Sequence, residues 1–473
     1  MMNKLKLIVS LVCLGSFYSC EEFLSPTPTV PEVDTYFTTE ENLYEGVFNM
    51  YDGIQGINST NVDDVHGIQL EYQITEMRSD NTRSKSGEGN ASQFDRFEVE
   101  PTNGTVANYY RSYYNVIYRA HIVLENLDAA TDQNRDAIEA EARFVRAYAY
   151  FNLVRLYGDI PLIEGIIGPG DLTTPYTRRP VADIYTLIKE DFNFAIQHLD
   201  NTHKNRASRA AAQTFLAKVH LIHQEYSEAL ALVNAVIASN RYSLEADFRD
   251  VFFQEDNSEV IFAIGFLPDN TDDSQNFSAE WLNAVGRSSG LNYVTDDAIV
   301  ALEAFGGPLR TPYSYRNDAA QTSQNQVVKY VPNGDEQLGI DPTSNDPTLA
   351  GNDWIVLRYA DVLLLHVEAT MDTGESTTNP DALRHFRTVR NRAGIFSAVT
   401  SVTKEDLINE RRVELAFENK RLFDLIRMGV AVETLLAFAD ANDFNFSAAD
   451  LLLPIPQREI NLSQGLMEQN PGY

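Results

Sequence analysis

The sequence has little cysteine, little tryptophan and no run of basic residues. Cys13 and Cys20 are the only two cysteines among 473 residues, so no internal disulfide can form if Cys13 is removed with the leader described below. Asp and Glu number 68 against 37 Lys and Arg, a formal net charge of −31, and the positive charges stand singly or in pairs such as Arg178-Arg179. Nucleic acid and anionic membrane surfaces attract cationic proteins, so neither is expected as the main partner.

Residues 1–19 have the pattern of an export signal. Lys4 and Lys6 precede an apolar run, Leu7–Leu14, which is too short for a membrane-spanning helix of about 20 residues. A small residue then stands before Cys20, as in a bacterial lipoprotein cleavage box, although Phe17 occupies a place usually held by Leu. Cys20 is therefore predicted to carry lipid and anchor the mature chain to a membrane. The alternative is an ordinary signal peptide with Cys20 as a bystander.

The rest of the chain is predicted to be one mostly α-helical domain. Residues 20–37 are interpreted as a lipidated N-terminus and an extended, proline-bearing spacer. Apolar residues recur at helical spacing in a scaffold at about 38–260 and 355–473 of the single domain 38–473. Between them, 260–354 is rich in Asp, Asn, Ser, Thr, Gly and Pro, with a few short strands. Long polar loops in compact domains are usually functional, so ligand binding is expected there.

Two helix pairs resemble tetratricopeptide units. In Arg209–Ser239, five residues occupy the places of that motif: Leu216, Ala217, Tyr226, Ala229 and Val233. A looser pair covers Ala360–Arg392. Ordinary helical hairpins are the alternative explanation, since both matches are degenerate.

The most distinctive segment is Asn409–Gly429, NERRVELAFENKRLFDLIRMG. Its pattern predicts an amphipathic helix with Ile408, Leu415, Leu422 and Ile426 on one face. Opposite charges three residues apart are expected to pair along it: Arg411 with Glu414, Glu418 with Arg421, Arg421 with Asp424, and Asp424 with Arg427. A structural role is favoured over catalysis by Glu410 or Glu414, because no positional partner is visible in the sequence.

This segment resembles the signature of the SusD/RagB family, surface lipoproteins of Bacteroidetes. Four further segments are similar to family segments and stand in the same order: Cys20–Pro26, Glu141–Pro161, Trp354–Ala369 and Leu453–Tyr473. The resemblance implies tetratricopeptide-like helix pairs that support an irregular binding region, and an outer-membrane location facing the cell exterior. It also implies a partner, a SusC-like TonB-dependent transporter to which a captured glycan is delivered. No chemistry on the ligand is implied, and neither a cofactor nor a metal is expected.

Motifs that could carry chemistry are incomplete. Gly286–Gly290 matches G-x-S-x-G but lacks the flanking strand and helix of a nucleophile elbow. His366-Val367-Glu368 lacks the cysteines of a zinc deaminase. His220 and His223 lack a third ligand, and Asp269–Asp273 lacks EF-hand spacing. No catalytic residue is assigned, although a carboxylate-pair glycoside hydrolase remains a third class of function.

Glycan binding requires flat aromatic faces together with planar amide, carboxylate or guanidinium groups. Trp354 is expected in the core, and Trp281 is the first candidate for a stacking platform, its alternative role being to pack the loop region onto the helices. The predicted ligand-binding residues are Asn276, Trp281, Arg287, Tyr293, Tyr313 and Tyr315 of the loop-rich region, with Asp80, Asn81 and Arg83 of an earlier polar turn. A peptide ligand, as in RagB-type members, is the rival because tryptophan is sparse.

Overall fold

The computed structural model describes residues 36–283, 290–318 and 321–473. The predicted lipidation site Cys20 lies outside the described residues, as do the leader, the spacer up to residue 35, and Arg287. In these three ranges, no helix is both long enough and apolar enough to cross a membrane.

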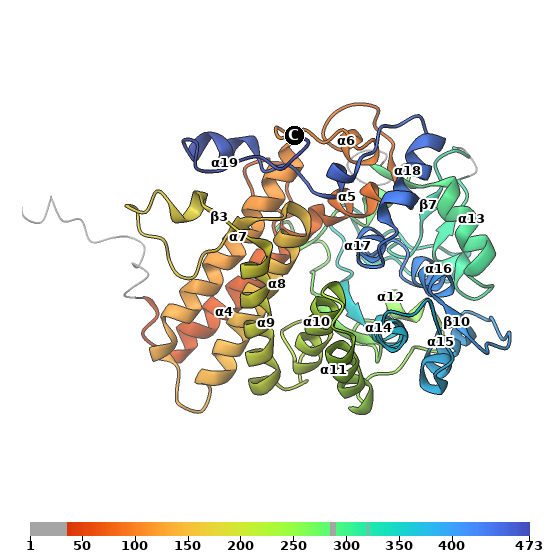
Figure 1. Cartoon of the computed structure of the whole chain (residues 1–473), viewed down its shortest axis with the longest axis horizontal. Helices are drawn as coiled ribbons and strands as arrows, with labels where there is room; N and C mark the ends of the chain where they lie inside the picture. Colours follow the sequence, from red (N-terminus) through yellow and green to blue (C-terminus); the bar gives the residue numbers. More distant parts are fainter. Residues whose placement is uncertain (1–35, 284–289, 319–320) are drawn as a thin grey trace, which may run out of the picture.

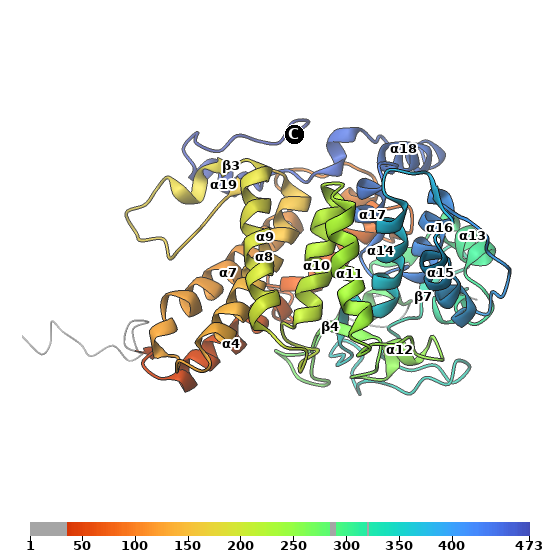
Figure 2. The ribbon, with the colours of Figure 1, turned by 60° about the horizontal axis from the view of Figure 1, so that its bottom comes forward.

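The scaffold is a row of helices in which each helix packs against the next (Figures 1 and 2). In spatial order the row contains α4 (Glu40–Gln55), α7 (Gly104–Glu125), α8 (Arg135–Tyr157), α9 (Val181–His198), α10 (Arg209–Ile222), α11 (Tyr226–Ala238), α14 (Tyr359–Met371) and α15 (Pro380–Arg392). α14 packs on α11 although the loop-rich segment separates them in sequence. The mostly α-helical fold class is confirmed, and both expected helix pairs form, as α10 with α11 and α14 with α15.

Local sequence signals determine where these helices begin and end. The Asn103 side chain accepts hydrogen bonds from two backbone N–H groups in the first turn of α7, and Ser208 caps α10 in the same way. Both residue types are preferred N-caps because they satisfy donors that lack an intrahelical partner. α8 is followed by Gly158 with φ of 70°, a conformation that suits glycine.

An aromatic cluster occupies the core between the central helices and the loop-rich segment. Phe144 of α8 contacts Phe192 of α9, Phe215 of α10 and Phe262 of a buried strand, with ring centroids 5.4–5.9 Å apart. All four rings are at most 3% exposed. The strand of Phe262 thereby attaches the loop-rich segment to the middle of the helix row.

The strands form five two-stranded antiparallel sheets within the described residues: β1 (Thr82–Ser84) with β5 (Asn292–Val294), β2 (Ile160–Pro161) with β3 (Arg178–Arg179), β4 (Val260–Ile264) with β8 (Trp354–Arg358), β6 (Tyr315–Arg316) with β7 (Gln326–Val327), and β9 (Ser376–Thr377) with β10 (Val402–Thr403). β4 and β8 bracket the loop-rich segment, and their pairing of Val260 with Arg358 and of Ile264 with Trp354 closes its two ends together. Trp354 is 3% exposed, which confirms the expected core position.

Shorter elements cover the scaffold. The short α-helices are α5 (Glu71–Ile74), α6 (Ser92–Asp95), α12 (Asp250–Phe253), α13 (Asp296–Phe305), α16 (Lys404–Glu414), α17 (Arg421–Arg427), α18 (Ala431–Ala441) and α19 (Gln457–Leu462). The 3-10 turns are η1 (Gly67–Leu70), η2 (Glu76–Arg78), η3 (Leu127–Ala129), η4 (Thr174–Tyr176), η5 (Ala279–Trp281), η6 (Thr311–Tyr313) and η7 (Ala448–Leu451).

The prediction of one amphipathic helix over Asn409–Gly429 is wrong. α16 ends at Glu414 and α17 begins at Arg421, and between them Phe417 and Asn419 adopt positive φ values of 65° and 59°. Of the four charge pairs expected along the helix, only Asp424 with Arg427 forms, at 2.8 Å. The other charged groups turn inward to partners from distant segments, which interrupts the helix.

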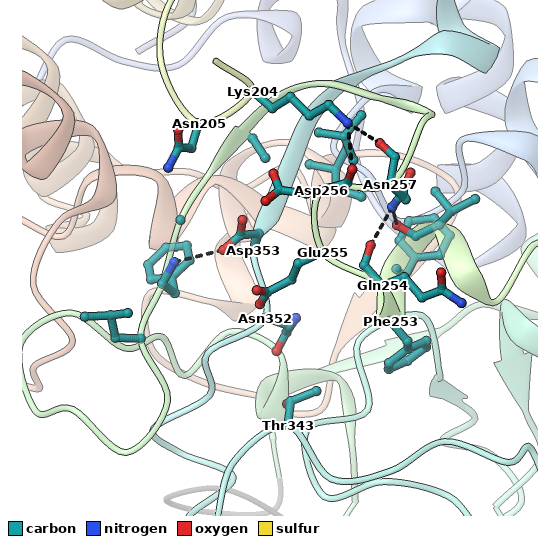
Figure 3. Close-up of a pocket in the computed structure, with 18 residues that line it drawn as sticks. Lys204, Asn205, Phe253, Gln254, Glu255, Asp256, Asn257, Thr343, Asn352 and Asp353 are labelled. Carbon is teal, nitrogen blue, oxygen red and sulfur yellow. Dashed lines mark hydrogen bonds between the residues drawn. The ribbon is translucent and has the colours of Figure 1, made fainter. Parts of the chain in front are cut away.

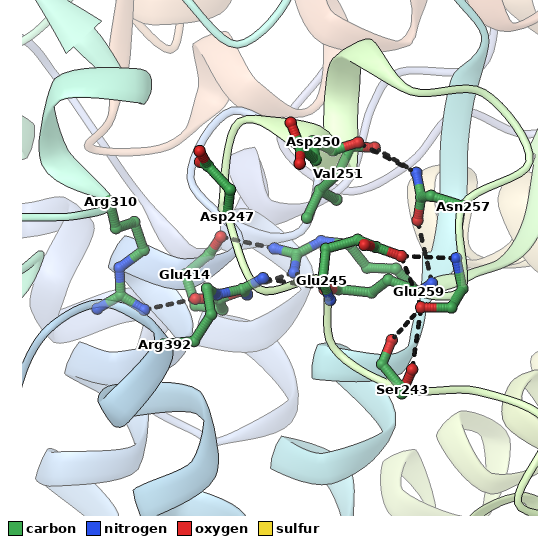
Figure 4. Close-up of polar contacts among 12 residues, drawn as sticks. Ser243, Glu245, Asp247, Asp250, Val251, Asn257, Glu259, Arg310, Arg392 and Glu414 are labelled. Carbon is green, nitrogen blue, oxygen red and sulfur yellow. Dashed lines mark hydrogen bonds and ion pairs between the residues drawn. The ribbon is translucent and has the colours of Figure 1, made fainter.

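Those partners form a buried ion network around Arg358, which we call the Arg358 network. The Arg358 guanidinium contacts Glu259 at 2.7 Å, Glu414 at 2.6 Å and Glu418 at 2.8 Å. Glu414 also pairs with Arg392 and with Arg310, the latter at 2.5 Å (Figure 4). Burial disfavours a charged Glu414, but the three guanidinium groups hold its pKa well below its usual range. The network therefore joins α15, α16, β8 and the loop-rich segment.

We expect Arg358→Met to lower the free energy of unfolding by about 3–5 kcal/mol, because three buried carboxylates lose a shared cation. Chemical denaturation followed by circular dichroism measures this change. Arg384→Met is the matched control, since Arg384 and its partner Asp381 are each 59% exposed and exposed pairs contribute about 0–1 kcal/mol. Equal effects of the two substitutions would contradict the role of the Arg358 network.

Candidate functional site

Strand pairing brings together two of the residues predicted from sequence. β1 and β5 are antiparallel, and Arg83 lies directly opposite Tyr293 in their register. Directly opposed residues of an antiparallel pair project from the same face. The polar turn near residue 80 and the loop-rich segment thus meet at one surface.

Arg83 is also held by residues that follow α18. Its guanidinium lies over the ring of Phe444, 4.5 Å from the centroid, and donates a hydrogen bond of 2.9 Å to the Asn442 side chain. A longer contact of 3.4 Å joins it to Asp95. We call Arg83, Tyr293, Asn442 and Phe444 the Arg83 surface.

The Arg83 surface combines accessible rings with hydrogen-bonding groups. The Arg83 side chain is 24% exposed, and Tyr293 and Phe444 are half-buried. Burial raises the pKa of the Tyr293 hydroxyl, so it remains a neutral donor and acceptor at physiological pH. Such a surface suits a ligand that has flat apolar faces edged by hydroxyl groups.

Phe444 and Asn442 were not identified from the sequence. They lie in a short polar stretch, Asn442–Ser447, that contains two phenylalanines. Two aromatic residues in a polar stretch could have marked it as a possible binding segment. No local pattern, however, indicated that it contacts β1, more than 350 residues earlier.

The expectation that Trp281 is a stacking platform is wrong for this structure. Its side chain is completely buried and packs against Tyr72, Tyr330 and Phe417, with ring centroids 5.4–6.5 Å apart. A ligand cannot reach either face of the indole. The physical reason is that η5 folds back onto the core, as the alternative interpretation of the sequence proposed.

Asp80 and Asn81 are also buried and have protein partners. Both Asp80 carboxylate oxygens accept hydrogen bonds of 2.8 Å from Arg421, and Arg412 lies 3.0 Å away. Burial alone would raise the pKa of Asp80, but these two guanidinium groups hold it well below its usual range. Asn81 donates to Glu76 and accepts from Arg412, each at 3.0 Å. Both side chains therefore stabilise the fold and are not presented to solvent.

The other predicted residues that the structure describes do not join the Arg83 surface. Asn276 is buried and donates to Glu280 at 2.5 Å. Tyr315 is 7% exposed and donates to Glu303, and burial together with that carboxylate raises its pKa to about 12. Tyr313 is half-buried in η6. Arg287 lies outside the described residues.

Two of the motifs tested for chemistry have partners that the structure describes, whereas residues 286–289 of the G-x-S-x-G match lie outside the described residues. His366 is buried against the ring of His385, with centroids 4.4 Å apart, and burial lowers the pKa of both imidazoles. The Asp269 carboxylate accepts backbone N–H groups of Asn345 and Asp346 at 2.9–3.2 Å. In the part of the chain that the structure describes, no three His, Cys, Asp or Glu side chains are arranged to hold a metal ion.

Two family models match the chain. The model described as "Starch-binding associating with outer membrane" matches residues 24–221, and the SusD family model matches residues 307–473. Together they cover more than three quarters of the chain, including the scaffold helices α4 to α10 and the segment of α16 and α17.

Curated proteins are similar over nearly the whole chain. "SusD-like protein P2" of Formosa agariphila is 25% identical over 517 residues, a match that covers 100% of both chains. A "SusD-like protein" of Bacteroides ovatus is 26% identical over 481 residues, covering 89% of this chain and 82% of that one.

Solved structures share the fold. A "Laminarin binding SusD-like protein" superposes with a TM-score of 0.74 at 22% identity, covering 92% of this chain and 100% of that one. Surface glycan-binding protein A from Bacteroides thetaiotaomicron, in complex with laminarihexaose, gives a TM-score of 0.76 at 22% identity with the same coverage.

We expect Trp281→Ala to lower the free energy of unfolding by about 3–5 kcal/mol, because it leaves a large cavity in the core. Denaturant titration followed by tyrosine fluorescence and circular dichroism measures the loss. Tyr313→Ala, at a half-buried ring, is the control and should cost much less. A Trp281→Ala protein as stable as the wild type would show that the indole is not a core residue.

Proposed function

The chain belongs to the SusD family, and we propose that it is a cell-surface lipoprotein that binds a neutral glycan. The observation that carries the proposal is the Arg83 surface, where two half-buried rings, a guanidinium group and an amide converge. Sugar rings offer C–H faces for stacking and paired hydroxyls for planar polar groups. The family description that names starch binding and outer-membrane association supports the same conclusion.

The class of glycan follows from charge and from the structural neighbours. A formal net charge of −31 repels acidic polysaccharides at long range. Two neighbours of the same fold are described by their binding of laminarin or laminarihexaose, which are uncharged glucans. We therefore choose laminarihexaose as the first probe.

The cellular role we propose is capture and delivery. Lipid at Cys20 would hold the protein on the outer membrane, facing the exterior, and a SusC-like TonB-dependent transporter would receive the bound glycan. The lipoprotein-type leader and the family membership support this role. We propose no catalytic step: incubation of the protein with laminarin should release no new reducing ends, and sustained release would overturn this part of the proposal.

For the Arg83 surface, we expect Tyr293→Ala to weaken laminarihexaose binding about three- to tenfold, because one stacking face is lost. Tyr293→Phe keeps the ring and should retain most of the affinity. Isothermal titration calorimetry measures both, with thermal unfolding as the check that each variant is folded. Unchanged binding by Tyr293→Ala would remove the Arg83 surface as the site. Binding of peptides but not glycans would favour the RagB-like alternative.

For anchoring, we expect Cys20→Ser to move the protein from the membrane fraction to the soluble fraction of its native host, because acylation requires the thiol. Fractionation with immunoblotting measures this shift. Cys13→Ser, within the leader, is the control and should leave the protein with the membranes. Retention of the Cys20→Ser protein on membranes after a salt wash would contradict a lipid anchor.

A further inference from the structure

Two cavities adjoin where β4 ends and the scaffold begins. The first, of about 280 Å³, lies between the residues following α12 and those preceding β8, and the second, of about 290 Å³, lies against α4. Asn205 and Gly265 line both cavities, so we treat them as one trough. No residue of the Arg83 surface lines it. The combined volume of the two cavities lies within the range of about 300–1,000 Å³ that small-molecule sites occupy.

Several polar groups that line the trough are not used by the fold. The side chains of Asn205, Glu255 and Asp256 are exposed and have no hydrogen-bond or ion-pair partner among the described residues, and in Figure 3 Glu255 points toward the middle of the lining residues. Asp353 accepts one hydrogen bond, from the Phe266 N–H at 3.1 Å, through a single carboxylate oxygen. These groups could accept or donate hydrogen bonds to a ligand without breaking a contact of the fold.

The cationic side chains beside the trough are already engaged. Lys204 donates to the backbone carbonyls of Asp256 and Asn257 at 2.7 and 2.6 Å (Figure 3). Arg206 pairs with the Glu141 carboxylate. Lys204 keeps its positive charge, because backbone carbonyls are neutral, but the carboxylates of Glu255 and Asp256 outnumber it in the lining. Burial, with the charges of these two carboxylates, raises the pKa of Asp353 to about 7, so Asp353 is partly protonated at neutral pH. An anionic ligand would be repelled.

Each of the two cavities, the compartments of the trough, has aromatic rings in its wall. Phe48 of α4 is 53% exposed in the second compartment, and the Arg206 guanidinium lies 5.2 Å from its centroid. Phe253, at the end of α12, is half-buried at the wall of the first (Figure 3). Phe48 shares its cavity with the Asn205 amide, and Phe253 shares the other with Asn205, Glu255 and Asp256, so each cavity combines a ring with polar groups of the kind that a sugar requires.

Gly265 keeps the junction between the compartments open. A Cβ built on Gly265 would meet only the Asp353 carboxylate, at 3.6 Å, which is an ordinary contact. Because Gly265 lines both cavities and its Cβ position is clear of backbone, we expect a leucine here to occupy the trough. This position offers a way to block the trough while the fold is kept.

From these observations we propose that the trough is a second carbohydrate-binding site, separate from the Arg83 surface, which takes uncharged sugar units and rejects uronic acids. Its carboxylate and amide groups bind hydroxyls, and Phe48 stacks on a ring face. The class of ligand rests on the proposed function, whereas the existence and place of the site do not. Two sites on one protein would hold a long polysaccharide more tightly than either alone, because the second contact is intramolecular.

The test is the stoichiometry of laminarihexaose binding measured by isothermal titration calorimetry. We expect two sites in the wild type and one in Gly265→Leu. Tyr293→Ala should keep the trough and bind about three- to tenfold more weakly at the Arg83 surface, and the double variant should keep only that weakened site. Gly265→Ser is the matched control, because its small side chain leaves the trough open. Phe48→Ala removes an exposed ring and should weaken the same site about three- to tenfold, so the proposal remains testable if Gly265→Leu does not fold.

The outcomes separate the two proposals. If Gly265→Leu and Phe48→Ala bind as the wild type does while Tyr293→Ala is weakened, the trough is not a site and the proposed function stands. If only the trough variants are weakened, the trough is the site and the Arg83 surface is not. If the wild type binds no laminarihexaose at millimolar concentration, both proposals fail for neutral glucans. Binding of hexagalacturonate that Gly265→Leu abolishes would overturn the selection against acidic sugars.

Discussion

The Arg358 network is the interaction on which the rest of the structure depends. Buried charges are tolerated only when each one is paired and hydrogen-bonded. Here one guanidinium satisfies three carboxylates from two distant parts of the chain, Glu259 before β4, and Glu414 and Glu418 beyond α15. The network can form only when the loop-rich segment, α15 and α16 are all docked. Apolar packing alone would tolerate partial docking, whereas a partly docked chain would leave charged groups unpaired in the interior. The network therefore couples the C-terminal region to the loop-rich segment.

This coupling explains where binding surfaces can arise. The loop-rich segment has little regular structure of its own, and it is attached to the scaffold by β4 with β8 at its ends and by β1 with β5 within it. The Arg83 surface lies where β5 of the loop-rich segment pairs with β1 from the early part of the chain. The trough lies beside the pair of β4 and β8, and one of its two cavities lies against α4. Solved structures at 22% identity share this fold, so the scaffold keeps its shape while the sequence changes. Loops at the edges of the helix row can then change their surfaces without altering the scaffold.

The acidity of the chain acts differently in its two environments. In the Arg358 network, buried carboxylates are paired with arginines, and Glu414 alone contacts three of them, Arg310, Arg358 and Arg392. Around the trough, carboxylates outnumber the ammonium group of Lys204, and the resulting field disfavours anionic ligands. The same residue type therefore contributes to folding where it is paired and to selectivity where it is not.

The sequence by itself determined the mostly helical class, the two helix pairs, the place of the loop-rich segment and the core position of Trp354, because periodicity and composition report burial that is local to each segment. It could not determine side-chain partners. Asp80 was predicted at a ligand site, yet its partner Arg421 is 341 positions away, and Trp281 was predicted to be exposed, yet rings from three distant segments enclose it. Arg83 and Tyr293 were both identified from residue type, but only the register of β1 on β5 placed them on one face, since contacts between strands some 200 residues apart depend on tertiary packing that no local pattern encodes.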